Sequence, residues 1–376
     1  MNFKKLDEFM KAMPERGFPC NEIAVSVDGK TVYRIGTGYA DVEHTRPVDS
    51  GNLYWLYSIS KVITCIAAMR LVEEGRLGLS DPVSKYLPEY ASLTVKESDG
   101  TVRPAKTVMT VEHLFTMSAG LDYSTAKPSF REAVAKGAGT RELVASLAEG
   151  PLCFDPGTHY LYSFCHDVLG AVIEVVTEKS LSEYFSELFF EPLEIRDMGF
   201  DPTPEQEARF SAMYYYRDGA GIATPTPVRN SFRFTPRFEG GGAGLFGSVD
   251  EYMKIITAVA CGGTATNGYR ILKPETVAMM TENRMSDVQL DDLVSTTRYG
   301  YGFGLCGRVH MNPARSLCLS PVGEFGWSSA SSHHVLIDPK NRLAFHYATH
   351  ILDCKYAHNK IHPALRNLVY EGLFAE

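Results

Sequence analysis

The chain has 376 residues, more than one compact domain usually contains, and its 44% hydrophobic and 22% charged residues are ordinary for a globular protein. Its formal net charge of −8 argues against a nucleic-acid-binding surface or a polybasic membrane contact, since both need clustered positive charge. A small-molecule substrate is therefore the expected partner, bound by one large domain with an insertion or by two domains.

The first residues predict an amphipathic helix rather than a secretory signal. Apolar residues recur at helical spacing, while acidic residues interrupt the apolar run that a signal peptide needs. The predicted helix buries Phe3, Leu6, Met10 and Met13. No apolar run is long enough to span a bilayer. We expect a cytoplasmic protein that does not associate with membranes.

Strands are predicted at both ends of the chain. Residues 23–42 alternate apolar and polar residues around Asp28-Gly29, which is typical of a β-hairpin. Strands return at 333–339 and 341–350, before a last predicted helix at 362–374. Because the two ends carry the strands, we expect them to share one sheet.

The middle of the chain is predicted to be largely helical. One helix is expected to begin near Ser58, with Gly75 able to end it, and several shorter helices follow, separated by Pro and Gly. The expected fold class is α/β (α+β), with an antiparallel sheet flanked by helices. Residues 1–80 and 290–376 form the expected sandwich domain. Residues 81–289 form a mostly helical insertion, and the active site lies in the cleft between the two parts.

Ser58 and Lys61 form an S-x-x-K pair that suits nucleophilic catalysis. On a helix, i,i+3 spacing brings the lysine amine to the same face as the serine hydroxyl, and a serine needs such a neighbouring base to become a nucleophile. The alternative is an ordinary helix-capping serine with a solvated lysine. A second copy, Ser124 to Lys127, precedes Pro128, which disfavours helical geometry, so we predict a loop there.

Several longer stretches support the catalytic interpretation. These are YSISKVITCIAAMRLVEEGRLGLSDPVSKYLPEY around Ser58, MTVEHLFTMSAGL, GGGAGLFGSVDEYMKI and YGYGFGL. Together they resemble the family of class C β-lactamases, serine D-alanyl-D-alanine carboxypeptidases and family VIII-type esterases. The resemblance covers most of the chain and implies a β-lactamase/transpeptidase-like fold and a serine nucleophile.

The resemblance also implies further site residues. Tyr162 matches the tyrosine of the family's Tyr-x-Asn motif, which shares proton transfer with the lysine, but Phe164 stands at the asparagine position. The third family motif, usually Lys-Thr-Gly or His-x-Gly, is matched by Trp327, Ser328 and Ser329. By the same register, the backbone N–H groups of Ser58 and Ala330 form the oxyanion hole. Phe164, Trp327, Ser328 and Ser329 are expected to contact substrate.

These departures set the expected substrate class. The family usually holds a substrate carboxylate with the cation of its third motif and the asparagine of its second, and Trp327 and Phe164 replace both. A Ser58 acyl-enzyme acting on small uncharged esters, or transferring their acyl group, is therefore favoured. One alternative is a β-lactamase, a D-alanyl-D-alanine carboxypeptidase or a D-amino-acid peptidase, acting on amides. Another is a non-catalytic binding protein that keeps the fold.

No metal or organic cofactor is expected. The eight cysteines are scattered without C-x-x-C or zinc-like spacing, so free thiols are predicted. Residues 242–247 fit G-x-G-x-x-G, but they follow a loop and not the first strand of a βαβ unit, which argues against dinucleotide binding.

Overall fold

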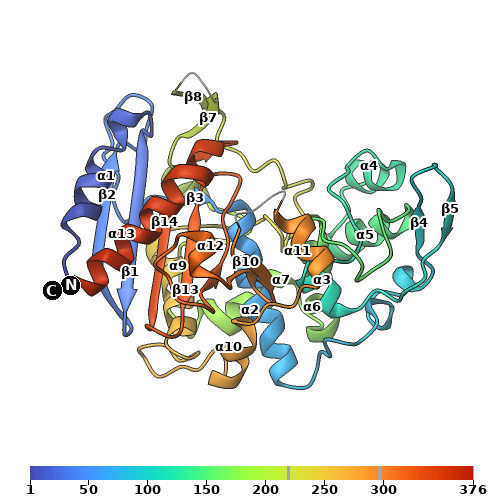
Figure 1. Cartoon of the computed structure of the whole chain (residues 1–376). Helices are drawn as coiled ribbons and strands as arrows, with labels where there is room; N and C mark the ends of the chain where they lie inside the picture. Colours follow the sequence, from blue (N-terminus) through green and yellow to red (C-terminus); the bar gives the residue numbers. More distant parts are fainter. Residues whose placement is uncertain (218–220, 295–298, 376) are drawn as a thin grey trace.

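A seven-stranded antiparallel sheet built from both ends of the chain organises the computed structural model, which describes residues 1–217, 221–294 and 299–375 (Figure 1). The strand order is β10-β11-β12-β13-β14-β1-β2. These strands are β1 (Cys20–Val27), β2 (Lys30–Gly38), β10 (Tyr301–Gly304), β11 (Gly307–His310), β12 (Phe325–Gly326), β13 (His334–Asp338) and β14 (Leu343–Ala348). The predicted α/β class with an antiparallel sheet is confirmed.

Local sequence explains how the sheet closes. Asp28 and Gly29 both adopt positive φ, at 49° and 80°, as a two-residue hairpin turn with right-handed strand twist requires. This turn joins β1 to β2, as the sequence predicted. On its other side β1 pairs with β14, with Ile23 opposite Tyr347. The N-terminal and C-terminal segments are thus hydrogen-bonded neighbours in the sheet.

Alternate residues of β14 face two different cores, one on each side of the sheet. On one face, large residues such as Phe345 and Tyr347 pack with helices α1 (Lys4–Lys11) and α13 (His362–Phe374). On the other face, alanines such as Ala344 and Ala348 share a core with helix α9 (Val249–Ala260). Small side chains let that helix approach the strands closely. Helices therefore cover both faces.

The remaining helices lie mainly on the other side of the molecule from α1 and α13 (Figure 1). They are α2 (Ser60–Glu73), α3 (Val111–Phe115), α4 (Pro128–Ala135), α5 (Thr140–Ala145), α6 (Cys165–Thr177), α7 (Leu181–Phe185), α8 (Pro204–Glu207), α10 (Pro274–Met280), α11 (Asp287–Val294) and α12 (Pro313–Ser316). The segment 81–289 therefore has two parts. Helix α9 packs on the sheet. Helices α3, α5 and α7 pack against α6, which packs against α2, and α4 packs against α5.

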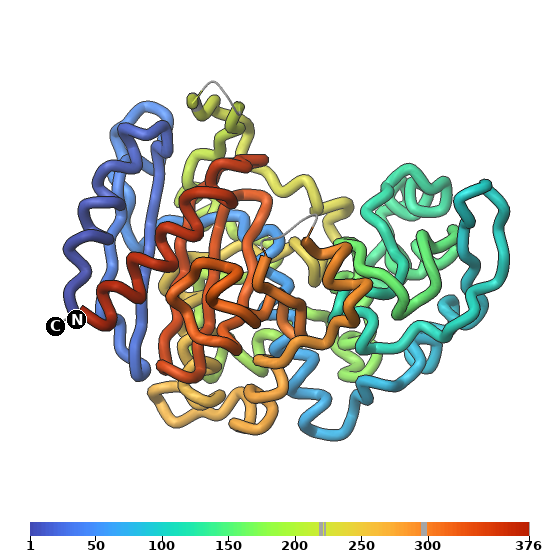
Figure 2. Tube along the Cα trace, viewed as in Figure 1, coloured from blue at the N-terminus to red at the C-terminus, as the bar shows by residue number. Residues whose placement is uncertain are grey.

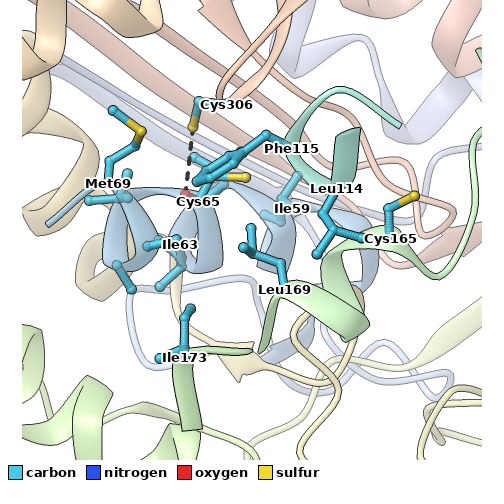
Figure 3. Packing of buried hydrophobic residues seen from close by; sticks show 14 of the residues in the cluster. Ile59, Ile63, Cys65, Met69, Leu114, Phe115, Cys165, Leu169, Ile173 and Cys306 are labelled. Carbon is cyan, nitrogen blue, oxygen red and sulfur yellow. Dashed lines mark hydrogen bonds between the residues drawn. The ribbon is translucent and has the colours of Figure 1, made fainter. Parts of the chain in front are cut away.

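Helix α2 is buried on almost every side and positions the start of the site. Its labelled residues Ile63 and Met69 lie among side chains of α3 and α6, including Phe115 and Leu169 (Figure 3). The helix begins at Ser60, after a 3₁₀ turn over Tyr57–Ile59, close to the predicted start near Ser58. Burial on all sides fixes the position and direction of this helix end.

Short strands complete the structure, and the chain ends meet. These strands are β3 (Tyr54–Trp55), β4 (Thr94–Lys96), β5 (Val102–Pro104), β6 (Met198–Gly199), β7 (Met213–Arg217), β8 (Ile222–Thr226), β9 (Phe246–Gly247) and β15 (Ile351–Leu352). Figure 2 shows the two termini side by side, where the Asn2 N–H donates to the Gly372 carbonyl at 2.8 Å. Of the helices in the described ranges, none has both the length and the apolar character to cross a bilayer.

Candidate active site

Ser58 and Lys61 meet at the N-terminal end of α2. The Lys61 ammonium donates to the Ser58 hydroxyl at 3.5 Å and to the Gly242 carbonyl at 2.6 Å. Lys61 is 2% exposed, whereas Ser58 is half-buried and lines a cavity. Tyr57, the residue before the serine, adopts φ of 47°, which is uncommon for a bulky residue and is found at functional turns. This turn presents the serine hydroxyl to the cavity and to the lysine.

A glycine loop holds Lys61 from the opposite side. The Asp167 carboxylate accepts from the Gly242 N–H at 3.0 Å, and the carbonyl of Gly242 is the one that Lys61 binds. A side chain at Gly242 would collide with the Asp167 carboxylate, which is why the loop needs glycine there. Burial raises the pKa of Asp167 to about 6, against the opposing effects of the Lys61 charge and the Gly242 N–H.

Tyr162 and Trp327 form the next part of the site. The Trp327 indole N–H donates to the Tyr162 phenol oxygen at 3.0 Å, and the Lys61 ammonium lies 4.8 Å from the centre of the Tyr162 ring. Because a lone pair of the phenol oxygen accepts this bond, the tyrosine's own proton is free to point elsewhere.

Tyr123 is a site residue that the sequence did not reveal. Its ring meets the Tyr162 ring edge-on at 5.6 Å and lies 5.7 Å from the Lys61 ammonium. Burial is the main cause that raises its pKa well above the ordinary value, so it is a neutral phenol. The residue comes two positions after the family-like stretch that ends at Leu121, which is the only sequence indication of its place.

One cavity of about 550 Å³ gathers most of the predicted residues. Its walls include Ser58, Tyr162, Trp327, Ser328, Ser329 and Ala330. Phe164 does not line it. The Phe164 side chain is 1% exposed and packs edge-on against Tyr123, with ring centres 4.7 Å apart. Phe164 therefore packs in the core against Tyr123, and it is not among the residues that line this cavity.

The same cavity is also lined by two buried charges that the sequence did not reveal. Arg308 of β11 and Arg366 of α13 line it, and each is 4% exposed. Arg308 donates to the Glu324 carboxylate at 2.8 Å, and the Arg366 Nε lies 4.0 Å from the other oxygen of Glu324. The expected uncharged substrate was inferred from the residues at positions 164 and 327 alone. The sequences of strand β11 and helix α13 did not indicate that these arginines are buried, because an arginine in either element is expected on the surface.

Ser328 is held by a neutral histidine. The Ser328 hydroxyl lies 2.8 Å from Nδ1 of His334, and Nε2 of His334 lies 3.2 Å from the Arg366 guanidinium. A guanidinium only donates, so Nε2 accepts and Nδ1 carries the proton that is donated to Ser328. Burial lowers the pKa of His334 well below its ordinary value. His334 therefore donates to Ser328 and cannot act as a base toward it, and the Ser328 hydroxyl lines the cavity.

Comparison with known proteins agrees with this geometry. The family model described as Beta-lactamase matches residues 4–359, nearly the whole chain. The chain belongs to the β-lactamase family. Esterase EstB of Burkholderia gladioli is 30% identical over 354 residues, covering 88% of this chain and 85% of that protein. Acyltransferase calJ of Penicillium decumbens is 27% identical over 359 residues, covering 87% of this chain and 83% of that protein.

A solved structure shows the same fold. The structure of EstCE1, described as a hydrolase with promiscuous acyltransferase activity, superposes with a TM-score of 0.81 and 24% identity over 98% of each chain. This β-lactamase-family member is a serine hydrolase, and the family match together with the relatives supports esterase or acyltransferase function. The alternative of a non-catalytic binding protein is therefore set aside.

Two other sequence predictions concern sites outside the cavity. Residues 121–127, with the second S-x-x-K copy, are irregular, and α4 begins only at Pro128, as expected for a loop. Lys127 donates to the Leu147 carbonyl at 3.2 Å and not to Ser124. Within the described ranges, no group of three or more His, Cys, Asp or Glu side chains is arranged to hold a metal ion.

Proposed function

We propose that this β-lactamase-family protein hydrolyses small-molecule esters, or transfers their acyl group to an alcohol, through an acyl-enzyme on Ser58. The observation that carries the proposal is the Lys61 Nζ nitrogen at 3.5 Å from the Ser58 hydroxyl, beside the half-buried phenol of Tyr162. As a neutral amine this nitrogen accepts the serine proton, and a serine hydroxyl becomes a useful nucleophile only with such an acceptor at hand.

The proposed chemistry runs in two balanced steps. In the first, the Ser58 oxygen attacks the ester carbonyl while its proton passes to the Lys61–Tyr162 pair. The N–H groups of Ser58 and Ala330 hold the oxyanion, and the departing alcohol takes the proton as the C–O bond breaks. In the second step, water or another alcohol gives a proton to the pair as its oxygen attacks the acyl-enzyme carbonyl, and the pair passes this proton to the Ser58 oxygen as the bond between Ser58 and the acyl group breaks.

Trp327 positions Tyr162 in this scheme. Its N–H donates to the phenol oxygen at 3.0 Å, which stabilises negative charge on that oxygen when the tyrosine gives up its proton. The family's third motif places a cation here. In this chain a neutral indole at that position donates to Tyr162 and offers no charge to a substrate carboxylate.

The walls next to Ser58 favour an uncharged group beside the scissile bond. Tyr162 and Trp327 present aromatic surface there, and the Trp327 ring packs edge-on against Phe303 at 5.1 Å. A charge placed against such a wall would lose its hydration without a partner. Hydrolysis of β-lactams or D-alanyl amides remains the second candidate.

We also propose how the chain is divided into domains and where in the cell it is located. The sandwich of 1–80 and 290–376 and the helical insertion 81–289 enclose the cleft, with α9 added to the sandwich because it packs on the sheet. We propose a cytoplasmic location, which the eight free cysteines support because a reducing compartment keeps thiols in that state. Fractionation of cells that express the protein tests the location.

The direct test uses two serine variants. Ser58→Ala should abolish hydrolysis of p-nitrophenyl butyrate while the melting temperature stays close to that of the wild type, because the change opens no core cavity. Ser124→Ala, in the second S-x-x-K copy, is the matched control and should keep full activity. Wild-type rates in Ser58→Ala contradict the proposal. The same preparation assayed with a chromogenic cephalosporin tests the amide alternative, which predicts that the lactam is the better substrate.

A further inference from the structure

A chain of buried hydroxyl groups links the two segments that carry the proposed oxyanion-hole N–H groups. The His333 N–H donates to the Ser329 hydroxyl oxygen at 3.2 Å, and the hydroxyl oxygens of Ser329 and Ser331 lie 2.9 Å apart. Ser331 in turn donates to the Trp55 carbonyl at 3.1 Å. Because the single hydroxyl proton of Ser331 goes to Trp55, Ser329 is the donor of the middle bond. The hydrogen bonds therefore all run in one direction, from His333 to Trp55.

The ends of this hydroxyl chain lie next to the two N–H groups. Ala330 stands between Ser329 and Ser331, and Ser58 follows Trp55 by three residues. Trp55 belongs to β3, whereas residues 329–331 precede β13. The bond from Ser331 to Trp55 thus joins residues 276 positions apart in the sequence. It ties the backbone that carries the Ala330 N–H to the backbone that leads to the Ser58 N–H.

Each of the two segments also contains a backbone conformation that its surroundings must impose. Tyr57, directly before Ser58, has φ of 47°, and Ser332, two residues after Ala330, has φ of 66°. Residues other than glycine rarely adopt such angles, and they keep them where neighbouring contacts hold the chain in place. A hydrogen-bonded link between the two turns opposes the relaxation of either one away from the other.

The link is buried, which strengthens its hydrogen bonds. Ser329, Ser331 and His333 are at most 1% exposed. A hydrogen bond in such surroundings is electrostatically stronger than in water, and removing one partner leaves a buried polar group unsatisfied. The Trp55 N–H is held as well, since it donates to Nε2 of His350 at 3.3 Å. Both polar groups of the Trp55 backbone are therefore bonded to side chains from the C-terminal part of the sheet domain.

We propose that Ser329 and Ser331 are positioning residues, whose hydroxyl chain holds the N–H groups of Ser58 and Ala330 at the separation that the oxyanion of the transition state requires. This inference rests on the Ser58 acyl-enzyme proposed above. It assigns the Ser329 hydroxyl to the chain and not to the substrate, because that hydroxyl already donates once and accepts once. The third family motif ends in glycine at this position, so the middle bond is a departure of this protein from the motif.

The proposed role predicts a loss in catalysis and not in substrate binding. Oxyanion-hole donors act only when they lie within hydrogen-bond distance of the charge as it develops. The carbonyl of the bound ester carries little of that charge, so a displaced N–H group weakens the transition state more than the ground state. A residue that merely stabilises the fold would lower the melting temperature and leave the rate of each folded active site unchanged.

Ser331→Ala removes the bond to Trp55 and is the first test. For p-nitrophenyl butyrate, kcat/KM per site titrated with a fluorophosphonate should fall about tenfold, which is less than the loss of a whole oxyanion donor. Phenylboronic acid, which forms a tetrahedral adduct with a nucleophilic serine, should bind more weakly by a similar factor. Calorimetry with the intact ester should give equal affinities for Ser58→Ala and for the double variant Ser58→Ala/Ser331→Ala.

Ser332 provides the matched control. It is as buried as Ser331 and also donates to a backbone carbonyl, that of Ile351 at 2.8 Å, which is not part of β3. Ser332→Ala should lower the melting temperature about as much as Ser331→Ala but keep the wild-type kcat/KM. Ser329→Ala is a milder variant that leaves the Trp55 bond in place, and its loss of kcat/KM should be smaller. Combined with Ser331→Ala it should add little, because both hydroxyls serve one chain.

The outcomes separate this inference from the esterase proposal. If Ser58→Ala still hydrolyses the ester, the nucleophile is wrong and the positioning role fails with it. If Ser58→Ala is inactive but Ser331→Ala keeps the wild-type kcat/KM and affinity for phenylboronic acid, the positioning role fails alone. An equal loss of kcat/KM in Ser332→Ala would also overturn it. Should Ser331→Ala not fold, Ser329→Ala gives the same readouts, and wild-type values in that variant would contradict the proposal.

Discussion

The indole N–H of Trp327 donates to the phenol oxygen of Tyr162 at 3.0 Å, and this bond joins the third-motif segment to the proton-transfer pair. Trp327→Phe keeps an aromatic wall but removes the donor. We expect kcat/KM for p-nitrophenyl butyrate to fall by roughly ten- to a hundredfold, the scale of one hydrogen bond to a charged group.

The chain's other tryptophan supplies the control. Trp55 lies in a separate aromatic cluster with Phe210 and Phe246 and does not line the cavity. Trp55→Phe should lower the melting temperature but leave kcat/KM for p-nitrophenyl butyrate close to the wild-type value. An equal loss of kcat/KM in both variants would contradict a specific role for the Trp327 donor.

Lys61 and Tyr162 should behave as one unit. Lys61→Ala and Tyr162→Phe should each lower kcat/KM by roughly two orders of magnitude or more, the effect of losing a positioned acid-base group. If both serve one proton relay, the double variant should be little worse than the more damaged single variant. Fully additive losses in this double-mutant cycle would show instead that the two side chains act in separate steps.

Asp167 gives a prediction on pH. Since burial raises its pKa to about 6, the carboxyl takes up a proton as the pH falls through that value, and the Gly242 N–H loses its charged acceptor. Activity should therefore decline below about pH 6, and Asp167→Asn should lose this limb of the pH profile. An unchanged acid limb in the variant would assign that titration to another group.

The raised pKa of Asp167 also makes the stability of the folded protein depend on pH. Because the folded pKa of Asp167 lies above its ordinary value of 3.8, the stability linked to its protonation is fully present below about pH 4 and is lost as the pH rises through about 6. The melting temperature of Asp167→Asn relative to the wild type should thus improve between about pH 4 and about pH 7.

Gly242 tests the loop that holds Lys61. Gly242→Ala places a methyl group against the Asp167 carboxylate, so it should both destabilise the protein and displace the carbonyl that binds Lys61. We expect a loss of about 1–3 kcal/mol in unfolding free energy together with lower kcat. Gly199→Ala is the control, because its added methyl would lie 3.4 Å from the Phe246 ring, an ordinary contact. Equal effects of the two changes would contradict the account.

Much of the fold could be predicted because it follows from local pattern. The Asp28-Gly29 turn and the strands at both ends led to one shared antiparallel sheet, which the structure confirms. The helix near Ser58 was also correctly placed, to within its 3₁₀ turn. The packing of α9 on the sheet could not be predicted, because a helical pattern shows that one face is buried but not what buries it.

Residues of the site could be predicted only where their spacing along one helix or strand determines how they lie relative to each other. The i,i+3 pair Ser58 and Lys61 is of that kind. The Trp327 bond to Tyr162 joins residues 165 positions apart, and the Arg308–Glu324–Arg366 cluster joins two strands and the last helix. No sequence pattern marks an arginine as buried, so these charges become visible only when the sheet brings them together.

The most direct test of the central claim is to locate the nucleophile. The protein is treated with a fluorophosphonate, the intact mass is measured, and the modified peptide is sequenced by mass spectrometry. The account predicts one adduct per chain, located on Ser58, with none on Ser124 or Ser328, and no adduct in Ser58→Ala. An adduct on another serine, or an unmodified wild-type chain that still hydrolyses p-nitrophenyl butyrate, would contradict it.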